Sequence, residues 1–136
     1  MLEQQRLFMH KRQPVVCGAF RIGCELCGHV ETVHGGITSA VFDNTFGWLA
    51  WLNKGAVYTA FLKVDYRTPI PCGQEVFFHT KIDRIDGRKV FVSGAATDAV
   101  GETKYADATA LFIEKRDERT AGHPMTRVIG TEGLKT

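Results

Sequence analysis

The stretch His34-Gly35-Gly36-Ile37-Thr38-Ser39-Ala40-Val41-Phe42-Asp43 decides how this chain folds and where its chemistry is concentrated. It opens an apolar segment that predicts a helix from about Gly35 to Asn53, ending before Gly55. Two glycines at the start of a helix leave backbone N–H groups uncrowded, at the positive end of the helix dipole. Donors in this position can stabilise an oxyanion.

Asp43 lies inside the apolar segment, past the first turns of the predicted helix and too late to cap it. A buried carboxylate costs free energy unless it is paired, hydrogen-bonded or catalytic. The structural alternative for Asp43 is therefore a buried salt bridge with an arginine or lysine. An oxyanion site and a lone carboxylate on one helix together predict acyl-transfer chemistry.

The spacing of these two groups restricts how they can act. Gly35 and Asp43 are 43 − 35 = 8 residues apart, which corresponds to about 12 Å of helical rise. One substrate carbonyl therefore cannot contact both groups of the same chain. If both act on it, they come from two chains packed antiparallel, and the site lies at a dimer interface.

The rest of the chain has strand character, with predicted strands at residues 15–22, 57–66, 74–85, 88–98 and 103–114. The polar residues 1–13 predict a short helix or a loose arm, residues 23–33 a loop, and the tail after residue 114 only partial order. Because the helix is apolar on nearly all sides, we expect the sheet to wrap around it. The expected architecture is α+β, with one long helix cradled in a curved antiparallel sheet.

Length and composition are those of an ordinary globular protein. The 136 residues predict one domain, 1–136, with a core at about 15–114, and a net charge of +2 gives no argument for nucleic acid as a partner. The N-terminus lacks the apolar core of a signal peptide, and the apolar segment is too short to span a bilayer. A cytoplasmic location is therefore expected.

Four cysteines are present, and Cys24-x-x-Cys27 followed by His29 raises the possibility of zinc. The second half-site at the usual spacing is missing. Cys17 can be a small buried residue in a strand, and Cys72 lies in a Pro-Cys-Gly turn. We expect reduced thiols and no metal.

Several segments in order resemble the hotdog-fold acyl-CoA thioesterases, most of all the group of thioesterase superfamily members four and five. The His34-Gly35-Gly36 and Asp43 pattern is followed by residues 59–71, 83–93 and 106–113, which are similar to successive strands of that family. The resemblance implies hydrolysis of a medium- or long-chain fatty acyl-CoA without a cofactor. It also implies a homodimer, with a tetramer of two dimers as a further assembly, and leaves an aryl-acyl substrate open.

The resemblance assigns catalytic roles to five residues. Asp43 is general base on a water or nucleophile, and the N–H of Gly35 or Gly36 stabilises the oxyanion. His34 either titrates in catalysis or caps the helix, and we favour the positioning role. Thr59, in the strand beside the carboxylate, orients water or substrate, although a threonine in a strand also follows from β-propensity alone.

Four further residues fall on positions that contact CoA in the family: Asp65, Arg67, Arg88 and Lys89. Arg88 and Lys89 also make physical sense as phosphate ligands, their alternative being a solvated hairpin. Asp65 departs from the family's Asn, and its carboxylate would repel phosphate. Gly28 stands where some relatives carry an amide that holds the attacking water.

Two other functions compete with hydrolysis. A hotdog protein can bind acyl-CoA without cleaving it, as a sensor or scaffold, but such a module gains nothing from burying Asp43. A hotdog hydratase pairs its carboxylate with a histidine a few residues downstream. Here His79 is the nearest candidate by strand order, and it falls on the charged face of its strand.

Overall fold

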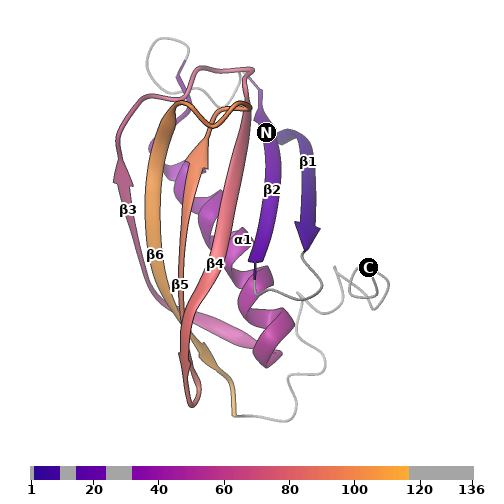
Figure 1. Cartoon of the computed structure of the whole chain (residues 1–136), viewed down its shortest axis with the longest axis vertical. Coiled ribbons are helices and arrows are strands. Elements are labelled where there is room, and N and C mark those ends of the chain that lie inside the picture. Colours follow the sequence, from indigo (N-terminus) through magenta and orange to yellow (C-terminus); the bar gives the residue numbers. More distant parts are fainter. Residues whose placement is uncertain (1, 10–14, 24–31, 117–136) are drawn as a thin grey trace.

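One antiparallel sheet and one helix make up the fold in the computed structural model, which describes residues 2–9, 15–23 and 32–116. The helix α1 (Gly35–Lys54) crosses one face of the curved sheet (Figure 1). The strands are β1 (Leu2–Met9), β2 (Val15–Ile22), β3 (Val57–Tyr66), β4 (Glu75–Asp86), β5 (Lys89–Thr97) and β6 (Lys104–Glu114). Their order across the sheet is β1-β2-β4-β5-β6-β3, so β3 lies at an edge.

The helix and five of the strands agree with the sequence-based prediction to within one residue at almost every end. The N-terminal segment does not. Residues 2–9 form β1, paired antiparallel with β2 from Leu2↔Ile22 to Met9↔Val16, where a helix or a loose arm was predicted. Strand pairing is made by backbone groups, so a segment of mostly polar composition can add a strand to an unpaired sheet edge.

The core lies between α1 and the sheet face that it covers. Phe42 of the helix meets Phe78 of β4 edge to face, with ring centroids 4.9 Å apart, and both are fully buried. Burial of one such side chain stabilises the fold by about 1.5–3 kcal/mol. Gly94 of β5 lets the two layers approach closely, because a Cβ there would lie 2.6 Å from the backbone oxygen of His79 and 3.1 Å from Phe46.

The sheet covers α1 less completely than the apolar sequence predicts. Gly36, Ala40 and Asn44 are exposed along one side of the helix. The edge strand β3 is also open, with Phe61 49% and Tyr66 55% exposed. The open edge of β3 lies beside this helix, because Thr59 and Tyr66 of β3 bind Asp43 and Gly35 of α1.

A β-bulge in β3 determines which of its side chains face α1. The pairing with β6 shifts between Thr59 and Phe61, so Ala60 is the extra residue. Thr59 pairs with Phe112 and Tyr66 with Ala106, both buried on the helix side of β6. Without the bulge, Thr59 and Tyr66 would point to opposite faces of the sheet, since they are an odd number of residues apart.

The cysteines contradict the expectation of reduced thiols at one position. Cys72 is disulfide-bonded, whereas Cys17 is a free thiol whose pKa is raised by burial. Cys24 and Cys27 lie outside the described residues.

Candidate active site

The carboxylate of Asp43 and the hydroxyl of Thr59 meet in the structure. Thr59 Oγ1 donates a 2.8 Å hydrogen bond to Asp43 Oδ1. Asp43 is half-buried and not deeply buried as the apolar sequence predicts, because it lies between the buried stripe of α1 and its open side. Among the described residues no arginine or lysine pairs with it, so the salt-bridge alternative finds no partner there.

The start of α1 is capped by His34. Its Nδ1 accepts a 3.0 Å hydrogen bond from the N–H of Gly36, which requires the ring proton to be on Nε2. The carbonyl of His34 accepts the N–H of Ile37 at 3.0 Å. The predicted capping contact of His34 is therefore present, and it occupies the N–H of Gly36.

Gly35 is then the remaining candidate for the oxyanion donor. Within the described part of the chain, the N–H of Gly35 donates no hydrogen bond. The N–H of Gly36, the other glycine that the sequence left open, is engaged by His34. A free N–H at the first position of a 20-residue helix is at the most positive point of the backbone.

Two residues of this region were missed by sequence reasoning, Ser39 and Tyr66. The Tyr66 hydroxyl donates to the carbonyl of Gly35 at 2.6 Å and lies 2.5 Å from Ser39 Oγ. Ser39 is four residues after Gly35 and four before Asp43, so the three share one face of the helix. That spacing could have identified Ser39. The contact of Tyr66 with α1 could not be predicted, because the bulge that turns this side chain towards the helix is not visible in the sequence.

A cavity of about 300 Å³ opens beside Gly35. Its wall is formed by Val33, Thr38, Tyr66, Arg67, Ile70 and Tyr105, among others. Burial, followed by the negative charge of Asp98, raises the pKa of Tyr105, so its hydroxyl stays neutral at physiological pH. The volume lies at the lower end of the range for ligand pockets.

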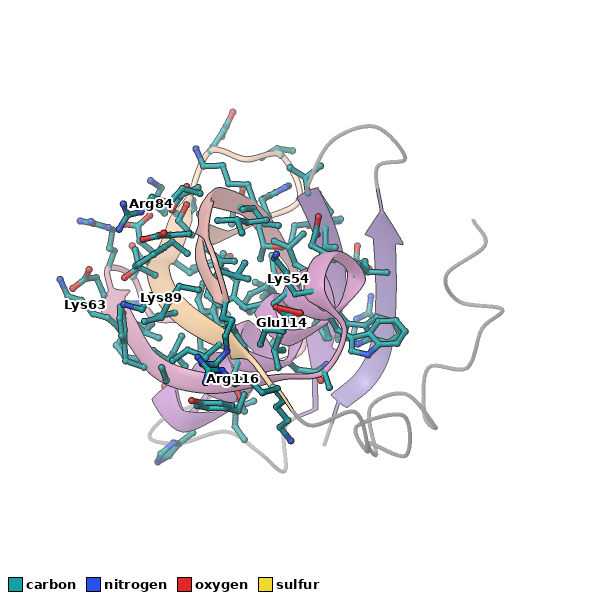
Figure 2. The ribbon with its side chains drawn as sticks, turned by 90° about the horizontal axis from the view of Figure 1, so that it is seen from below. Lys54, Lys63, Arg84, Lys89, Glu114 and Arg116 are labelled. Atoms are coloured by element: carbon teal, nitrogen blue, oxygen red, sulfur yellow. The ribbon has the colours of Figure 1, made fainter. Side chains whose placement is uncertain are left out.

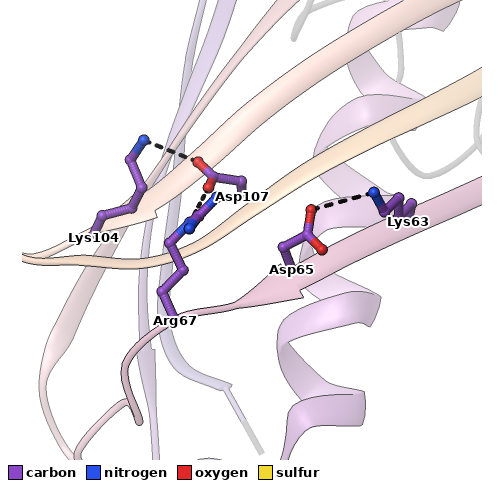
Figure 3. Close-up of polar contacts among 5 residues, drawn as sticks. All are labelled: Lys63, Asp65, Arg67, Lys104 and Asp107. Atoms are coloured by element: carbon purple, nitrogen blue, oxygen red, sulfur yellow. Dashed lines mark hydrogen bonds and ion pairs between the residues drawn. The ribbon is translucent and has the colours of Figure 1, made fainter.

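Two of the four predicted CoA contacts are engaged in ion pairs (Figure 3). Arg67 binds Asp107 of β6 through its Nε, and Lys104 approaches the same carboxylate at 3.0 Å. Partial burial acts to raise the pKa of Asp107, but the hydrogen bonds and charges of these two cations outweigh it and lower that pKa. Asp65 Oδ2 lies 3.7 Å from Lys63 Nζ. Arg67 is therefore already engaged within the chain, in a cluster of two cations on one carboxylate.

The other two, Arg88 and Lys89, belong to the β4–β5 hairpin. Arg88 Nε donates a 3.1 Å hydrogen bond to the backbone oxygen of Glu114. Lys89 is exposed at the hairpin end of the molecule (Figure 2) and makes no polar contact with the described residues. Glu114 pairs with Val57, so Arg88 lies near the start of β3, whereas Arg67 directly follows its last residue. The two arginines are therefore separated by the length of this 10-residue strand, about 30 Å.

His79 lies on the sheet face that points away from the helix. Its Nδ1 is 3.6 Å from the Cys17 sulfur, and its Nε2 is 3.4 Å from Thr97 Oγ1. The residues that flank it on β4, Phe78 and Thr80, are the ones buried under α1. His79 therefore cannot pair with Asp43, and the arrangement that the hydratase alternative requires is not formed by these residues. Gly28 lies outside the described residues.

Comparison with known proteins places this geometry in a family. The Thioesterase superfamily matches residues 31–105. The acyl-coenzyme A thioesterase THEM4 of Rattus norvegicus is 36% identical over 108 residues, 79% of this chain and 46% of the relative. THEM4 of Xenopus laevis is 37% identical over 108 residues, 79% of this chain and 49% of the relative. The chain thus spans about half the length of these curated relatives.

Solved structures agree with the architecture. A hypothetical thioesterase from Streptococcus pneumoniae, determined with coenzyme A, superposes with a TM-score of 0.74 at 12% identity, covering 82% of this chain and 88% of its own. No helix among the residues described is long and apolar enough to cross a membrane. One helix on a curved antiparallel sheet, with a matching region that includes both Gly35 and Asp43, makes this chain a hotdog-fold member of the thioesterase superfamily.

Proposed function

We propose that the chain hydrolyses the thioester bond of a fatty acyl-CoA, giving the free acid and CoA. The observation that carries this proposal is the presence, on the same helix face, of a half-buried Asp43 held by Thr59 and a Gly35 N–H that no described residue accepts. The relatives named acyl-coenzyme A thioesterases support it. Because this chain spans about half the length of these relatives, their activity is proposed for it and not transferred from their names.

The proposed chemistry needs no group beyond the side chains and backbone already described. Thr59 fixes one oxygen of the Asp43 carboxylate and leaves the other free to take a proton from water. The resulting hydroxide attacks the thioester carbon, and the Gly35 N–H stabilises the negative charge on the carbonyl oxygen. The C–S bond then breaks, and the CoA thiolate takes up a proton. Direct attack by Asp43, through a mixed anhydride, stays the alternative route.

The site is proposed to form between two copies of the chain, because Gly35 and Asp43 are too far apart along α1. The open β3 edge lies beside both groups, with Thr59 next to Asp43 and Tyr66 next to Gly35. A long apolar edge strand is a template for pairing with another chain. Two β3 strands running antiparallel would bring Asp43 of one copy towards Gly35 of the second.

The register that we propose for this pairing puts the two-fold axis at Lys63 of β3, which is compatible with the bulge at Ala60. If the two-fold axis passes at Lys63, then Leu62 lies opposite Val64 of the second copy, and both are helix-facing. The two residues of the bulge, Thr59 and Ala60, then lie opposite Tyr66 of the second copy. Every opposed pair has its side chains on the same face of the combined sheet, as antiparallel pairing requires.

This pairing also places the candidate CoA residues. The end of β3 near Arg67 in one copy meets the hairpin end of the other, so groups about 30 Å apart in one chain approach across the interface. Because Arg67 is already paired with Asp107, we assign the CoA phosphates to Arg88 and Lys89 of the neighbouring copy. Asp65 is left to contact a hydroxyl or amine.

The acyl group is assigned to the cavity of about 300 Å³ beside Gly35, the apolar space nearest the proposed oxyanion donor. Its modest volume favours the medium-chain end of the fatty acyl range, and an aryl-acyl group would also fit its aromatic wall. Assembly of two dimers into a tetramer stays a prediction.

The test is release of the CoA thiol from acetyl, octanoyl, palmitoyl and phenylacetyl thioesters by the wild type and by Asp43→Asn. We expect octanoyl-CoA to be the best substrate of the panel. Turnover that collapses in the variant while substrate binding persists would support hydrolysis. Tight binding of acyl-CoA without turnover by either protein would instead favour the sensor or scaffold.

The interface is tested by single cysteine substitutions in β3. Lys63→Cys should give a disulfide-linked dimer on mild oxidation, because two residues at the axis oppose each other with Cβ atoms about 4.5–5.5 Å apart. Lys81→Cys, exposed on the outer face of β4, is the matched control and should stay uncrosslinked. Crosslinking of the control alone, or of neither variant, would contradict the proposed register.

A further inference from the structure

We propose that Tyr66 is a positioning residue for the oxyanion donor: its hydroxyl and ring hold the first turn of α1 so that the Gly35 N–H points at the reacting carbonyl. This inference rests on the proposed hydrolysis and adds a residue to its machinery. The hydroxyl donates to the carbonyl of Gly35 at 2.6 Å. Since a phenol has one proton, Ser39 Oγ must donate to Tyr66 across the 2.5 Å contact.

The peptide group between Gly35 and Gly36 is held at both of its ends. Tyr66 binds its carbonyl at 2.6 Å, and His34 Nδ1 accepts its N–H at 3.0 Å. The preceding peptide is held at its carbonyl, where His34 accepts the N–H of Ile37 at 3.0 Å. The Gly35 N–H is the free end of that preceding peptide, so its direction is fixed by anchors on both sides of the Gly35 Cα.

The ring of Tyr66 adds a steric restraint to these hydrogen bonds. A Cβ on Gly35 would lie 3.3 Å from Cζ and 3.4 Å from the hydroxyl oxygen of Tyr66. The ring therefore lies against the Gly35 Cα and accounts for the absence of a side chain there.

Two adjacent glycines are the reason such an anchor is needed. Glycine samples more backbone conformations than any other residue, so a helix that starts with Gly35 and Gly36 loses more entropy on ordering than one that starts with alanine. An oxyanion donor works through preorganisation, and small errors in its placement cost large factors in rate. Tyr66 comes from β3 and not from the helix, so it ties the donor to the sheet.

The experiment compares Tyr66→Phe with Tyr58→Phe. Both tyrosines belong to β3 and have similar exposure, 55% and 46%, but the Tyr58 hydroxyl has no hydrogen-bond partner among the described residues. We expect Tyr66→Phe to lower kcat on octanoyl-CoA about tenfold with KM changed by less than about twofold. Tyr58→Phe should stay within about twofold of the wild type. Equal kcat values for the two variants would overturn the proposal.

Ligand binding separates positioning from a general loss of structure. An octanoyl-CoA trifluoromethyl ketone, which mimics the oxyanion, should bind Tyr66→Phe about tenfold more weakly, in line with kcat. S-octyl-CoA, a non-hydrolysable thioether that has no carbonyl and forms no oxyanion, should bind it as it binds the wild type. Equal weakening of both ligands would show that Tyr66 supports the structure of the site as a whole, and would overturn the positioning role.

A spectroscopic readout makes the result independent of turnover. The backbone amide resonances of Gly35 and Gly36 should shift in Tyr66→Phe and stay in place in Tyr58→Phe. If the wild type hydrolyses no thioester, the proposed function fails, and the amide shifts still decide whether Tyr66 anchors the helix start. Unshifted glycine amides in Tyr66→Phe would overturn the anchor itself.

Discussion

The two ends of the contact between α1 and β3 are built differently. At one end, Tyr66 donates a hydrogen bond to the Gly35 carbonyl, His34 accepts one from the Gly36 N–H, and the Tyr66 ring lies against Gly35. At the other end, Asp43 is half-buried, and Thr59 gives its side chain the single hydrogen bond that it has among the described residues. The same pair of elements thus holds one backbone group tightly and leaves one carboxylate open.

This difference matches the two tasks that hydrolysis requires. A backbone donor for an oxyanion must be fixed before the reaction, because its stabilising effect depends on preorganisation. A carboxylate that activates water must keep a free oxygen that solvent can reach. The comparison therefore predicts that substitutions at the Gly35 end act through geometry, and that substitutions at the Asp43 end act through chemistry.

The largest effect is expected at the open end, from Asp43→Asn. The amide keeps the shape and can still accept the Thr59 hydrogen bond, but it cannot take a proton from water. We expect kcat to fall about 10³-fold, within the range for loss of a general base, with the melting temperature nearly unchanged. Steady-state kinetics and thermal unfolding of the same preparation measure both. A variant that keeps most of its kcat would remove Asp43 from the mechanism.

The next largest effect is expected at the tight end, from Gly35→Ala. The new methyl group would press on the Tyr66 ring at 3.3 Å and displace the donor, so kcat should fall about 10²-fold. Gly94→Ala is the contrasting variant, because its methyl group would meet the backbone oxygen of His79 at 2.6 Å. It should destabilise the fold by about 1–3 kcal/mol, measured by urea unfolding. The comparison fails if Gly35→Ala lowers stability and Gly94→Ala lowers only activity.

A smaller effect is expected from Thr59→Val, which removes the one hydrogen bond that holds Asp43. The carboxylate stays in place on the helix but loses its fixed orientation, so kcat should fall about tenfold. Thr59→Ser retains the hydroxyl and should recover most of the rate. If valine and serine behave alike, the 2.8 Å contact has no part in catalysis.

Sequence reasoning identified the parts of this site that follow from local pattern. The helix and the strand that follows it were predictable, because caps and turns mark where these elements start and stop. The place of Thr59 beside Asp43 came from the family resemblance, and the pattern of residues alone did not give it. The choice of Gly35 over Gly36 was not predictable, since it depends on which ring nitrogen of His34 turns back to the helix.

The contacts that sequence reasoning missed are tertiary. Tyr66 reaches Gly35 only because the extra residue Ala60 reverses the alternation of β3, and an alanine in a strand gives no sign of a bulge. The ion pair of Arg67 with Asp107 was also not predicted, because it depends on how β3 and β6 pair. β1 was missed because its pairing depends on backbone groups and not on an apolar pattern.

The smallest effect is expected from the ion pairs beyond the tight end, through Asp107→Asn. Arg67 and Lys104 lower the pKa of Asp107 in the folded state, so its contribution to stability is present above its unfolded pKa of about 3.9 and is lost as the pH falls through the folded value. Their side chains are 56% and 53% exposed, and solvent screening limits this contribution to about 1 kcal/mol or less. The melting temperature of the variant should therefore lie slightly below that of the wild type at pH 7, and the two should converge as the pH falls below the folded-state pKa of Asp107. If the difference in melting temperature stays the same in acid, Asp107 stabilises the fold through packing and not through its charge.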